Sequence, residues 1–367
     1  MAKTFKRLYP RITSFENLLE AAHRAQKGRR YRDSTLAFNA RLEENLHMLR
    51  MELLDGSYQP GEYRDFFIED SKKRLISAAP YRDRVVHHAV MAVIEPLFDR
   101  SFIFDTYACR KGKGSHAALL RFRHFLAGHR YVLKCDIRKY FQSMDHEILL
   151  AKLERRIACP PTMELLRRIV GSRDFNAQNP PAYFPGDDLF APLVRRRGIP
   201  VGNLTSQFFA NLFLNDFDHW LTEELRAGPY VRYVDDFCVF GNDKGALNAV
   251  REEIARRLGE LRLLMHEGKS RIYTHREGIE FLGFRHLPGQ VRVRRENVLR
   301  FKRRMRDLQS EYRLGRVTDE RVRASVVSWI AHAAWADSRW LRRTLIPTFA
   351  FVRASNHSSS SSFASAR

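Results

Sequence analysis

Cysteine is scarce in this sequence. The 367 residues include four cysteines, and no two of them form a C-x-x-C pair. They give no disulfide framework and no zinc motif, so we interpret them as reduced, mostly buried thiols of a cytoplasmic protein. The histidines show no metal-ligand spacing such as H-E-x-x-H. Neither residue type therefore points to a metal site.

Long apolar runs are also missing. No segment reaches the length that a membrane-spanning helix needs. The first seven residues, Met-Ala-Lys-Thr-Phe-Lys-Arg, are not followed by the apolar core of a signal peptide. We therefore expect a cytoplasmic protein without a membrane partner.

Acidic residues are in deficit. Lys and Arg number 64 against 42 Asp and Glu, which gives a formal net charge of +22 and a pI near 10.2. A soluble basic surface needs far less charge than this. The excess predicts a polyanionic partner, with nucleic acid preferred to a membrane surface.

Two of the acids lie side by side. Asp235 and Asp236 are enclosed by aromatic and β-branched runs between Tyr230 and Phe240. Such runs predict two strands, so we expect a hairpin with both acids at its turn. Adjacent carboxylates repel each other unless a cation lies between them. A solvated Asp-Asp turn without function is the favoured explanation of this dipeptide when it is taken alone.

A third acid changes that interpretation. Asp136 ends another apolar, strand-like run, and it lies 99 positions before Asp235, so the acids can meet only through the fold. Two-metal phosphoryl transfer needs carboxylate oxygens on hard divalent ions about 4 Å apart. A strand end and a hairpin turn can supply these oxygens together.

These residues carry a family resemblance. Tyr233-Val234-Asp235-Asp236 resembles the Tyr-X-Asp-Asp box of reverse transcriptases, and Asp136-Ile137 followed by Tyr140-Phe141 resembles their first catalytic motif. The resemblance implies an α+β right-hand polymerase that makes cDNA from dNTPs on an RNA template. It implies fingers at 56–130, a palm with finger insertions at 131–290 and a thumb at 291–354. Helical spacing predicts an N-terminal helical extension at 1–55, and Ser-rich composition predicts a disordered tail at 355–367.

The resemblance also assigns roles in catalysis. Asp136, Asp235 and Asp236 bind two Mg²⁺ ions, with Mn²⁺ as an alternative, and the Ile137 backbone completes one site. Phe141 is the bulky gate that clashes with a ribose 2′-hydroxyl. Lys269 donates a proton to pyrophosphate. Arg74 and Arg84 hold the triphosphate, although each is equally consistent with ordinary surface charge.

The segment 198–211 is expected to form the floor under the nascent base pair, with Val201, Gly202 and Gln207 near the nucleotide. Most reverse transcriptases have Gln where this chain has Val201, and the variant resembles diversity-generating retroelement enzymes. That subclass implies a structured template RNA and a small accessory protein. An antiphage defence enzyme, a group II intron-like enzyme and a non-catalytic basic nucleic-acid-binding module remain as alternatives.

Basic segments complete the predicted nucleic-acid interface. The loop 107–116 combines glycines with Arg110, Lys111 and Lys113, without the spacing of a Walker motif. Residues 292–306 contain eight Lys or Arg and one acid, with Val298, Phe301, Met305 and Leu308 as an apolar stripe. We expect this helix to hold a duplex through Arg300, Arg303 and Arg304. Further helices are predicted over 247–264 and 322–340.

Overall fold

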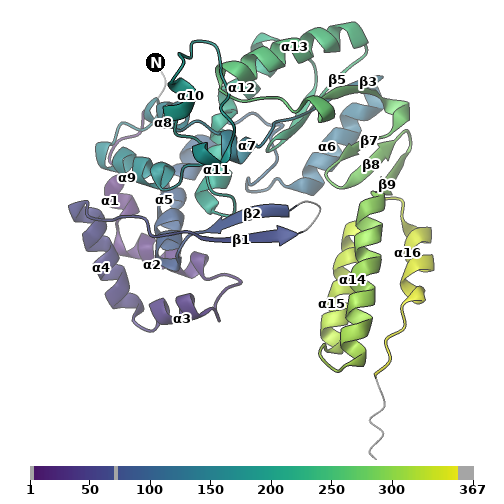
Figure 1. Ribbon diagram of the computed structural model, residues 1–367, viewed down its shortest axis with the longest axis horizontal. Coiled ribbons are helices and arrows are strands. Elements are labelled where there is room, and N and C mark those ends of the chain that lie inside the picture. The colour runs from purple at the N-terminus through teal and green to yellow at the C-terminus, as the bar shows by residue number, and fades with distance from the viewer. Residues whose placement is uncertain (1–3, 70–72, 354–367) are drawn as a thin grey trace, which may run out of the picture. The chain divides into compact units, whose positions relative to one another are not determined.

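Helices and short antiparallel strands make up an α+β fold in the computed structural model (Figure 1), which describes residues 4–69 and 73–353. The predicted Ser-rich tail lies outside these residues. The chain separates into two units, residues 1–273 and 274–367, so the palm–thumb boundary predicted at 290/291 falls within the second unit. No helix in the described ranges has the length and apolar character needed to cross a membrane.

The first unit begins with four helices and a hairpin. Ser14 caps the second helix by accepting a hydrogen bond from the Asn17 N–H at 3.2 Å, and Gly56 ends the fourth helix with a φ of 78°. The two strands pair in the antiparallel direction. These elements are α1 (Tyr9–Ile12), α2 (Phe15–Ala25), α3 (Asp33–Asn39), α4 (Leu42–Asp55), β1 (Arg64–Glu69) and β2 (Lys73–Ala78).

A buried helix, α5 (Tyr81–Asp99), forms the middle of the first unit. Val85, Val86, Ala89 and Val90 are fully buried, because α5 packs between α2 and α11 (Leu204–Phe213). Pro96 lies inside this helix, which continues to Asp99. The other helices of this unit are α6 (Ser115–Gly128), α7 (Tyr140–Ser143), α8 (His146–Glu154), α9 (Pro160–Gly171), α10 (Ala191–Val194), α12 (Asn215–His219) and α13 (Lys244–Glu260).

A four-stranded sheet carries the three acids. Its order is β4 (Tyr230–Tyr233), β5 (Asp236–Gly241), β3 (Tyr131–Asp136) and β6 (Arg271–Thr274). Helix α13 packs against β3 and β5, and α6 packs against β4. Residues 237–240 of β5 are all buried, which explains why this strand is continuously apolar instead of alternating.

The loop before α11 is anchored to the segment after α7. Gly198 has a φ of 93°, and a Cβ there would lie 2.6 Å from the Phe175 ring and 2.9 Å from the Gln142 carbonyl oxygen. Its N–H donates to the Met144 carbonyl at 2.7 Å, and its carbonyl bonds the His146 ring at 2.7 Å. Only glycine fits this position, so the loop enters α11 on a defined path.

The second unit is a three-stranded sheet followed by three helices. These are β7 (Ile279–Phe281), β8 (Phe284–Leu287), β9 (Gln290–Val293), α14 (Arg295–Arg313), α15 (Asp319–Ala333) and α16 (Arg339–Leu345). The predicted apolar stripe of α14 is confirmed. Phe301 and Met305 are buried, Val298 and Leu308 pack beside them, and the Phe301 ring stacks on Trp329 with centroids 4.0 Å apart.

Two predicted helix ends are wrong. The helix predicted over 322–340 breaks after Ala333, because Asp337 bonds Val291 through its backbone N–H (2.8 Å) and its carboxylate (2.7 Å). The helix predicted to reach Leu264 ends at Glu260, and Arg262 adopts a φ of 55°. In both places a tertiary contact or turn overrides helical periodicity.

Candidate active site

The three acids meet at one end of the central sheet. Asp136 and Asp236 are direct partners in the antiparallel pairing of β3 and β5. Asp235 occupies the two-residue turn between β4 and β5, and its carbonyl accepts from the Ile137 N–H at 3.2 Å. The predicted turn position is therefore correct for Asp235 and wrong for Asp236, which begins β5. Directly paired residues in antiparallel strands have Cα atoms about 4.5–5.5 Å apart.

Two lysines contact these carboxylates. Lys134 Nζ lies 3.2 Å from Asp236 Oδ2, and Lys269 Nζ lies 2.7 Å from Asp136 Oδ1. Lys134 is on β3, two residues before Asp136, and its side chain is only 16% exposed. Sequence reasoning missed Lys134 because a lysine in a strand usually points to solvent. A charged residue within a buried apolar run was the available signal.

Burial makes the acid cluster unfavourable when it is fully ionised. It raises the pKa of Asp236 to about 6, even though Lys134 acts in the opposite direction. It also raises the pKa of Asp235, and the Asp136 charge adds to this effect, while Lys269 and Arg74 oppose it. Asp236 Oδ1 is buried and has no hydrogen-bond partner among the described residues. A cation that reached these oxygens would relieve their repulsion.

The described residues contain no group of three or more His, Cys, Asp or Glu side chains arranged to hold a metal ion. In this structure Lys134 and Lys269 are paired with two of the three carboxylates. The donor set still suits a hard divalent ion, since all three side chains are carboxylates. The backbone of Ile137, the other predicted metal contact, is buried beside them.

The turn that carries Asp235 has a strained backbone. Val234 has a φ of 60°, which is rare for a β-branched residue. Hairpins with a positive φ at the first turn position usually place glycine there. Conformations of this kind cost about 1–3 kcal/mol and persist only where surrounding contacts maintain them.

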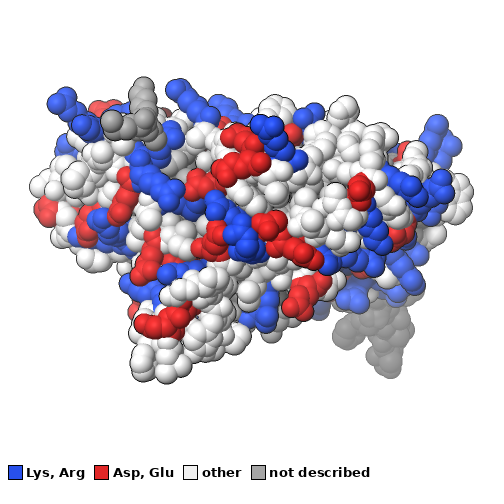
Figure 2. All heavy atoms as spheres, turned by 90° about the horizontal axis from the view of Figure 1, so that it is seen from above, with Lys and Arg blue, Asp and Glu red and all other residues white. Residues whose placement is uncertain are grey.

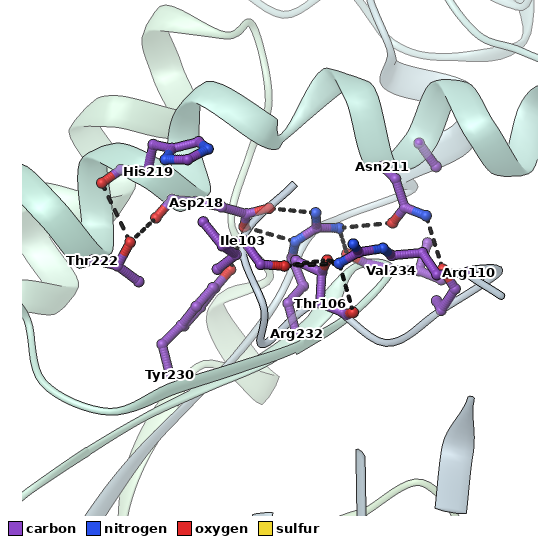
Figure 3. Close-up of polar contacts among 12 residues, drawn as sticks. Ile103, Thr106, Arg110, Asn211, Asp218, His219, Thr222, Tyr230, Arg232 and Val234 are labelled. Atoms are coloured by element: carbon purple, nitrogen blue, oxygen red, sulfur yellow. Dashed lines mark hydrogen bonds and ion pairs between the residues drawn. The ribbon is translucent and has the colours of Figure 1, made fainter. Parts of the chain in front are cut away.

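A buried arginine supplies those contacts (Figure 3). Arg232, on β4, is 1% exposed and makes a two-pronged ion pair with Asp218 on α12, with Nε 2.8 Å from Oδ1. Its Nη1 donates to the Val234 carbonyl oxygen at 3.1 Å. Tyr230 donates to the same Asp218 carboxylate at 2.8 Å. The ion pair thus joins the strained turn to the helix behind the sheet.

The loop predicted to lie under the nascent base pair contacts the β1–β2 hairpin. The Val201 carbonyl accepts from the Ser77 N–H at 3.2 Å, and a Cβ on Gly202 would lie 3.0 Å from Ile76. Asn203, which sequence reasoning missed, donates to the Ser77 carbonyl at 3.2 Å. Gln207 is exposed on α11. The hairpin and the loop are therefore held together by direct bonds.

The predicted phosphate-binding arginines lie in different surroundings. Arg74 is near enough to the acids to lower the pKa of Asp235. Arg84 instead lies over the Tyr81 ring, 5.4 Å from its centroid, and its charged neighbours include Arg29. Phe141, the predicted gate, is half-buried and packs edge-on against Tyr140 just after the β3 strand end. The geometry favours Arg74 over Arg84 as a residue near the reacting groups.

Some basic residues of the loop at 107–116 make contacts within the protein, and others are exposed. Arg110 is 9% exposed and binds Asp99, Ile103 and Thr106 at 2.6–2.7 Å, so its guanidinium holds the loop itself together (Figure 3). Lys113 donates to the Phe104 carbonyl at 2.9 Å and lies over its ring. Lys111 is exposed. In the second unit, Arg303 and Arg304 are exposed on α14, while Arg300 bonds Asn297.

Comparison with known proteins agrees with this arrangement of acids. A family model described as reverse transcriptase (RNA-dependent DNA polymerase) matches residues 68–286, more than half of the chain. The chain belongs to the reverse transcriptase family. The match includes all three acids and both lysines that contact them.

This reverse transcriptase is similar in sequence to several known proteins. It is 28% identical over 286 residues to protein YkfC of Escherichia coli K12, covering 67% of this chain and 72% of that protein. It is 23% identical over 185 residues to the group II intron-encoded protein LtrA of Lactococcus lactis, covering 49% of this chain and 29% of LtrA. Nuclear intron maturase 2 of Arabidopsis thaliana is 26% identical over 140 residues, which cover 34% of this chain and 19% of the maturase.

The Arg232 contacts predict a positioning role. Replacing Arg232 with Lys keeps the charge but removes the two-pronged pairing and the bond to Val234. A displacement of about 1 Å at a reacting group lowers rates by about a hundredfold. We expect Arg232→Lys to lower the maximal rate of primer extension about ten- to a hundredfold, with little change in duplex affinity. Single-turnover extension and duplex titration measure the two quantities.

Arg256→Lys is the matched control for that experiment, because Arg256 makes its ion pairs on the exposed surface of α13. The control should extend primers at the wild-type rate. A wild-type rate for Arg232→Lys as well would show that the turn does not need this guanidinium.

The raised pKa of Asp235 predicts a pH-dependent gain in stability. With EDTA present, Asp235→Asn should raise the Tm at pH 8, because the wild-type carboxylate is ionised at a buried position that disfavours its charge. The gain should disappear as the pH falls below the ordinary aspartate pKa, where the carboxyl is neutral in both the folded and the unfolded states. Thermal melts of both proteins across pH measure it, and a gain that is independent of pH would contradict the electrostatic explanation.

Proposed function

We propose that this reverse transcriptase is an active RNA-directed DNA polymerase that extends a DNA primer with dNTPs. The observation that carries the proposal is the convergence of three carboxylates: Asp136 faces Asp236 across two strands, and Asp235 lies in the adjoining turn. Enzymes that transfer nucleotidyl groups use carboxylates to bind the hard divalent cations that take part in the reaction. A polymerase layout follows, with the central sheet as palm, the β1–β2 hairpin in the fingers and α14–α15 in the thumb.

Two Mg²⁺ ions fit the acid cluster, with Mn²⁺ as an alternative. Asp136, Asp235 and Asp236 would hold them, with the Ile137 carbonyl as a further oxygen. When bound, such ions lower the pKa of the primer 3′-hydroxyl and stabilise charge on the leaving pyrophosphate. Lys269 is 37% exposed, so it can leave Asp136 as a cation enters.

The remaining residues of the site orient the substrates. Lys269 and Arg74 are the cations beside the acids, and they suit the triphosphate, with Lys269 also able to donate a proton to the leaving group. Phe141 follows the β3 strand end, where its ring would exclude a ribose 2′-hydroxyl. Val201 presents an apolar side chain on the loop that contacts the hairpin.

The charge of the chain suits a template–primer duplex. The net charge of +22 favours a polyanion, and the exposed Arg303 and Arg304 of α14 suit phosphate contacts. On the face drawn in Figure 2, Lys and Arg are interspersed with Asp and Glu, so positive charge there is spread instead of gathered. A non-catalytic binding module would not need three carboxylates at the end of a sheet, so charge alone does not explain the site.

Two subclasses have support from different observations. Val201 supports an error-prone enzyme of the diversity-generating retroelement type, with a structured template RNA and a small accessory protein as partners. The names of LtrA and the intron maturase support a group II intron-like enzyme. The chain covers only 29% of LtrA and 19% of the maturase, so nothing outside the matched region of those proteins is carried over to it. The error spectrum of the polymerase separates the two subclasses.

The catalytic assignment is tested by removing one carboxylate. Asp235→Ala should lower Mg²⁺-dependent primer extension by at least about a thousandfold, because several kcal/mol of transition-state stabilisation is lost. Template–primer binding should be retained. Glu252→Ala is the control, since Glu252 is an exposed acid on α13. Wild-type extension by Asp235→Ala, measured on a defined RNA with labelled primer, would refute the assignment.

The subclass is tested through fidelity. Val201 cannot hydrogen-bond near the nucleotide, so correct and incorrect pairs should differ less in transition-state energy. A loss of about 1.4 kcal/mol in that difference raises errors about tenfold. We expect frequent misincorporation, concentrated opposite template adenine, and about tenfold fewer errors in Val201→Gln.

Sequencing of cDNA made on a defined RNA measures these errors, with any accessory protein supplied. A low error rate in the wild type, independent of the template base, would favour the group II intron-like subclass and leave the polymerase assignment unchanged.

A further inference from the structure

Lys134 is a charged residue at the boundary between an apolar and an acidic part of the central sheet. Residues that face each other in antiparallel strands point to the same side of a sheet, so Lys134 of β3 shares one face with Cys238 and Asp236 of β5. Further along the same face lie Val132 and Phe240, which are both fully buried. An apolar side chain would suit the position of Lys134 as it suits that of Val132, so the charge of this lysine needs an explanation.

The ammonium group of Lys134 engages one oxygen of a site carboxylate. Its Nζ lies 3.2 Å from Asp236 Oδ2. The other oxygen of that carboxylate, Oδ1, is buried and has no hydrogen-bond partner among the described residues. A buried acceptor without a partner is unfavourable, and a cation is the group that would satisfy it. Lys134 therefore fixes Asp236 through one oxygen and leaves one oxygen for a metal ion.

The two lysines of the site differ in their freedom to move. Lys269 ends the short helix η3 (Glu267–Lys269) after α13, and its side chain is partly exposed. Lys134 lies within β3, which has β5 on one side and β6 on the other, and its side chain is mostly buried. Moving Lys134 away would leave a buried Asp236 charge without its counter-ion, which is strongly unfavourable. Lys269 can thus exchange with an arriving cation, whereas Lys134 stays in place.

The charges of the cluster show what a fixed lysine does there. Three carboxylates (−3) and two ammonium groups (+2) leave one net negative charge. Two divalent ions bring four positive charges, so the protein alone lacks the negative charge that would hold both of them. A substrate with several phosphate groups supplies it. Without Lys134 the cluster would carry two net negative charges, and a divalent ion would bind more readily before any substrate.

We propose that Lys134 is a positioning residue that acts through Asp236. Its ammonium group occupies that carboxylate permanently, weakens the binding of divalent ions to the nucleotide-free protein, and so makes their binding depend on a polyanionic substrate. That this substrate is a nucleoside triphosphate rests on the proposed polymerase function. The engagement of Asp236 does not, because it follows from the contacts of β3 and β5. A lysine that only stabilised the fold would leave the affinity for divalent ions unchanged.

The first test measures the binding of Mn²⁺ to the nucleotide-free protein. Electron paramagnetic resonance reports the free ion, and at pH 8 protons compete little for the carboxylates. Lys134→Met keeps a stem of similar length and removes the charge. We expect this variant to bind Mn²⁺ about tenfold more tightly than the wild type, because one full positive charge beside the cluster is gone. Equal or weaker binding by the folded variant overturns the proposal.

Lys152→Met is the matched control. Lys152, on α8, is also mostly buried and pairs with a carboxylate, that of Asp216 on α12, at 2.6 Å. Its replacement removes the same charge from the same kind of ion pair, but the partner is not one of the three site acids. The control should bind Mn²⁺ as the wild type does. A tenfold gain in Lys152→Met as well would reduce the effect to net charge and overturn the role of Lys134.

Thermal melts test whether Mn²⁺ takes over the function of the ammonium group. In EDTA, Lys134→Met should have a lower Tm than the wild type, because Asp236 has lost its counter-ion. Adding Mn²⁺ should raise the Tm more in the variant than in the wild type, since the tighter ligand stabilises the folded state more. An equal rise in both proteins contradicts the proposal.

A double variant and the wild type keep the inference testable if Lys134→Met does not fold. Lys134→Met/Asp236→Asn leaves no uncompensated charge, and it should bind Mn²⁺ no more tightly than the wild type. Tighter binding by the double variant would show that Lys134 does not act through Asp236. The wild type needs no substitution: if it binds two Mn²⁺ ions at micromolar concentrations without nucleotide, the proposal is wrong.

Primer extension separates this inference from the polymerase assignment. With saturating Mn²⁺, Lys134→Met should extend primers about tenfold more slowly in a single turnover, because Asp236 is no longer fixed, although it binds the ion more tightly. A variant that loses both extension and Mn²⁺ affinity contradicts the proposal. If the wild type extends no primer and Lys134→Met still binds Mn²⁺ more tightly, the role of Lys134 stands and the polymerase assignment fails. If the wild type extends primers and the Mn²⁺ affinities are equal, only the role of Lys134 fails.

Discussion

The buried ion pair between Arg232 and Asp218 is the interaction on which the acid cluster depends. Val234 adopts a backbone conformation that its side chain disfavours, and its carbonyl is held by Arg232. A buried pair of this kind is weak evidence for stability, because removing both charges from water offsets much of their attraction. Its value here is geometric. The planar guanidinium binds the helix, the strand and the turn at once, which a shorter or unforked cation could not do.

The acids themselves disfavour the folded arrangement, because they repel each other. They are buried close together, and the pKa of each acid in the turn region, Asp235 and Asp236, is raised. Lys134 and Lys269 offset part of this repulsion from the strand and from the loop after α13. The folded chain thus keeps an unfavourable charge arrangement in place through contacts elsewhere. Such an arrangement is typical of a site adapted to a cation that arrives with the substrate.

The sequence predicted the elements whose signal is local. β3 and the β4–β5 hairpin are apolar runs ended by acids, and the apolar stripe of α14 repeats at helical spacing. It failed where distant contacts decide. Asp337 leaves its helix to pair with Val291, and Arg110, predicted to face nucleic acid, turns inward to Asp99. The roles of Arg232 and Asn203 depend on partners far along the chain, so no local pattern reveals them.

Two arginines show why partners matter more than residue type. Arg232 is 1% exposed and Arg197 is 6% exposed, so both guanidinium groups have lost nearly all contact with water. Arg232 has Asp218 as a counter-ion, and its guanidinium also holds the turn that carries Asp235. The carboxylates nearest to Arg197 are committed to a backbone N–H and to other arginines, and its guanidinium borders an open pocket. The same type of side chain is therefore paired with a carboxylate in one place and bonded to backbone carbonyl oxygens in the other.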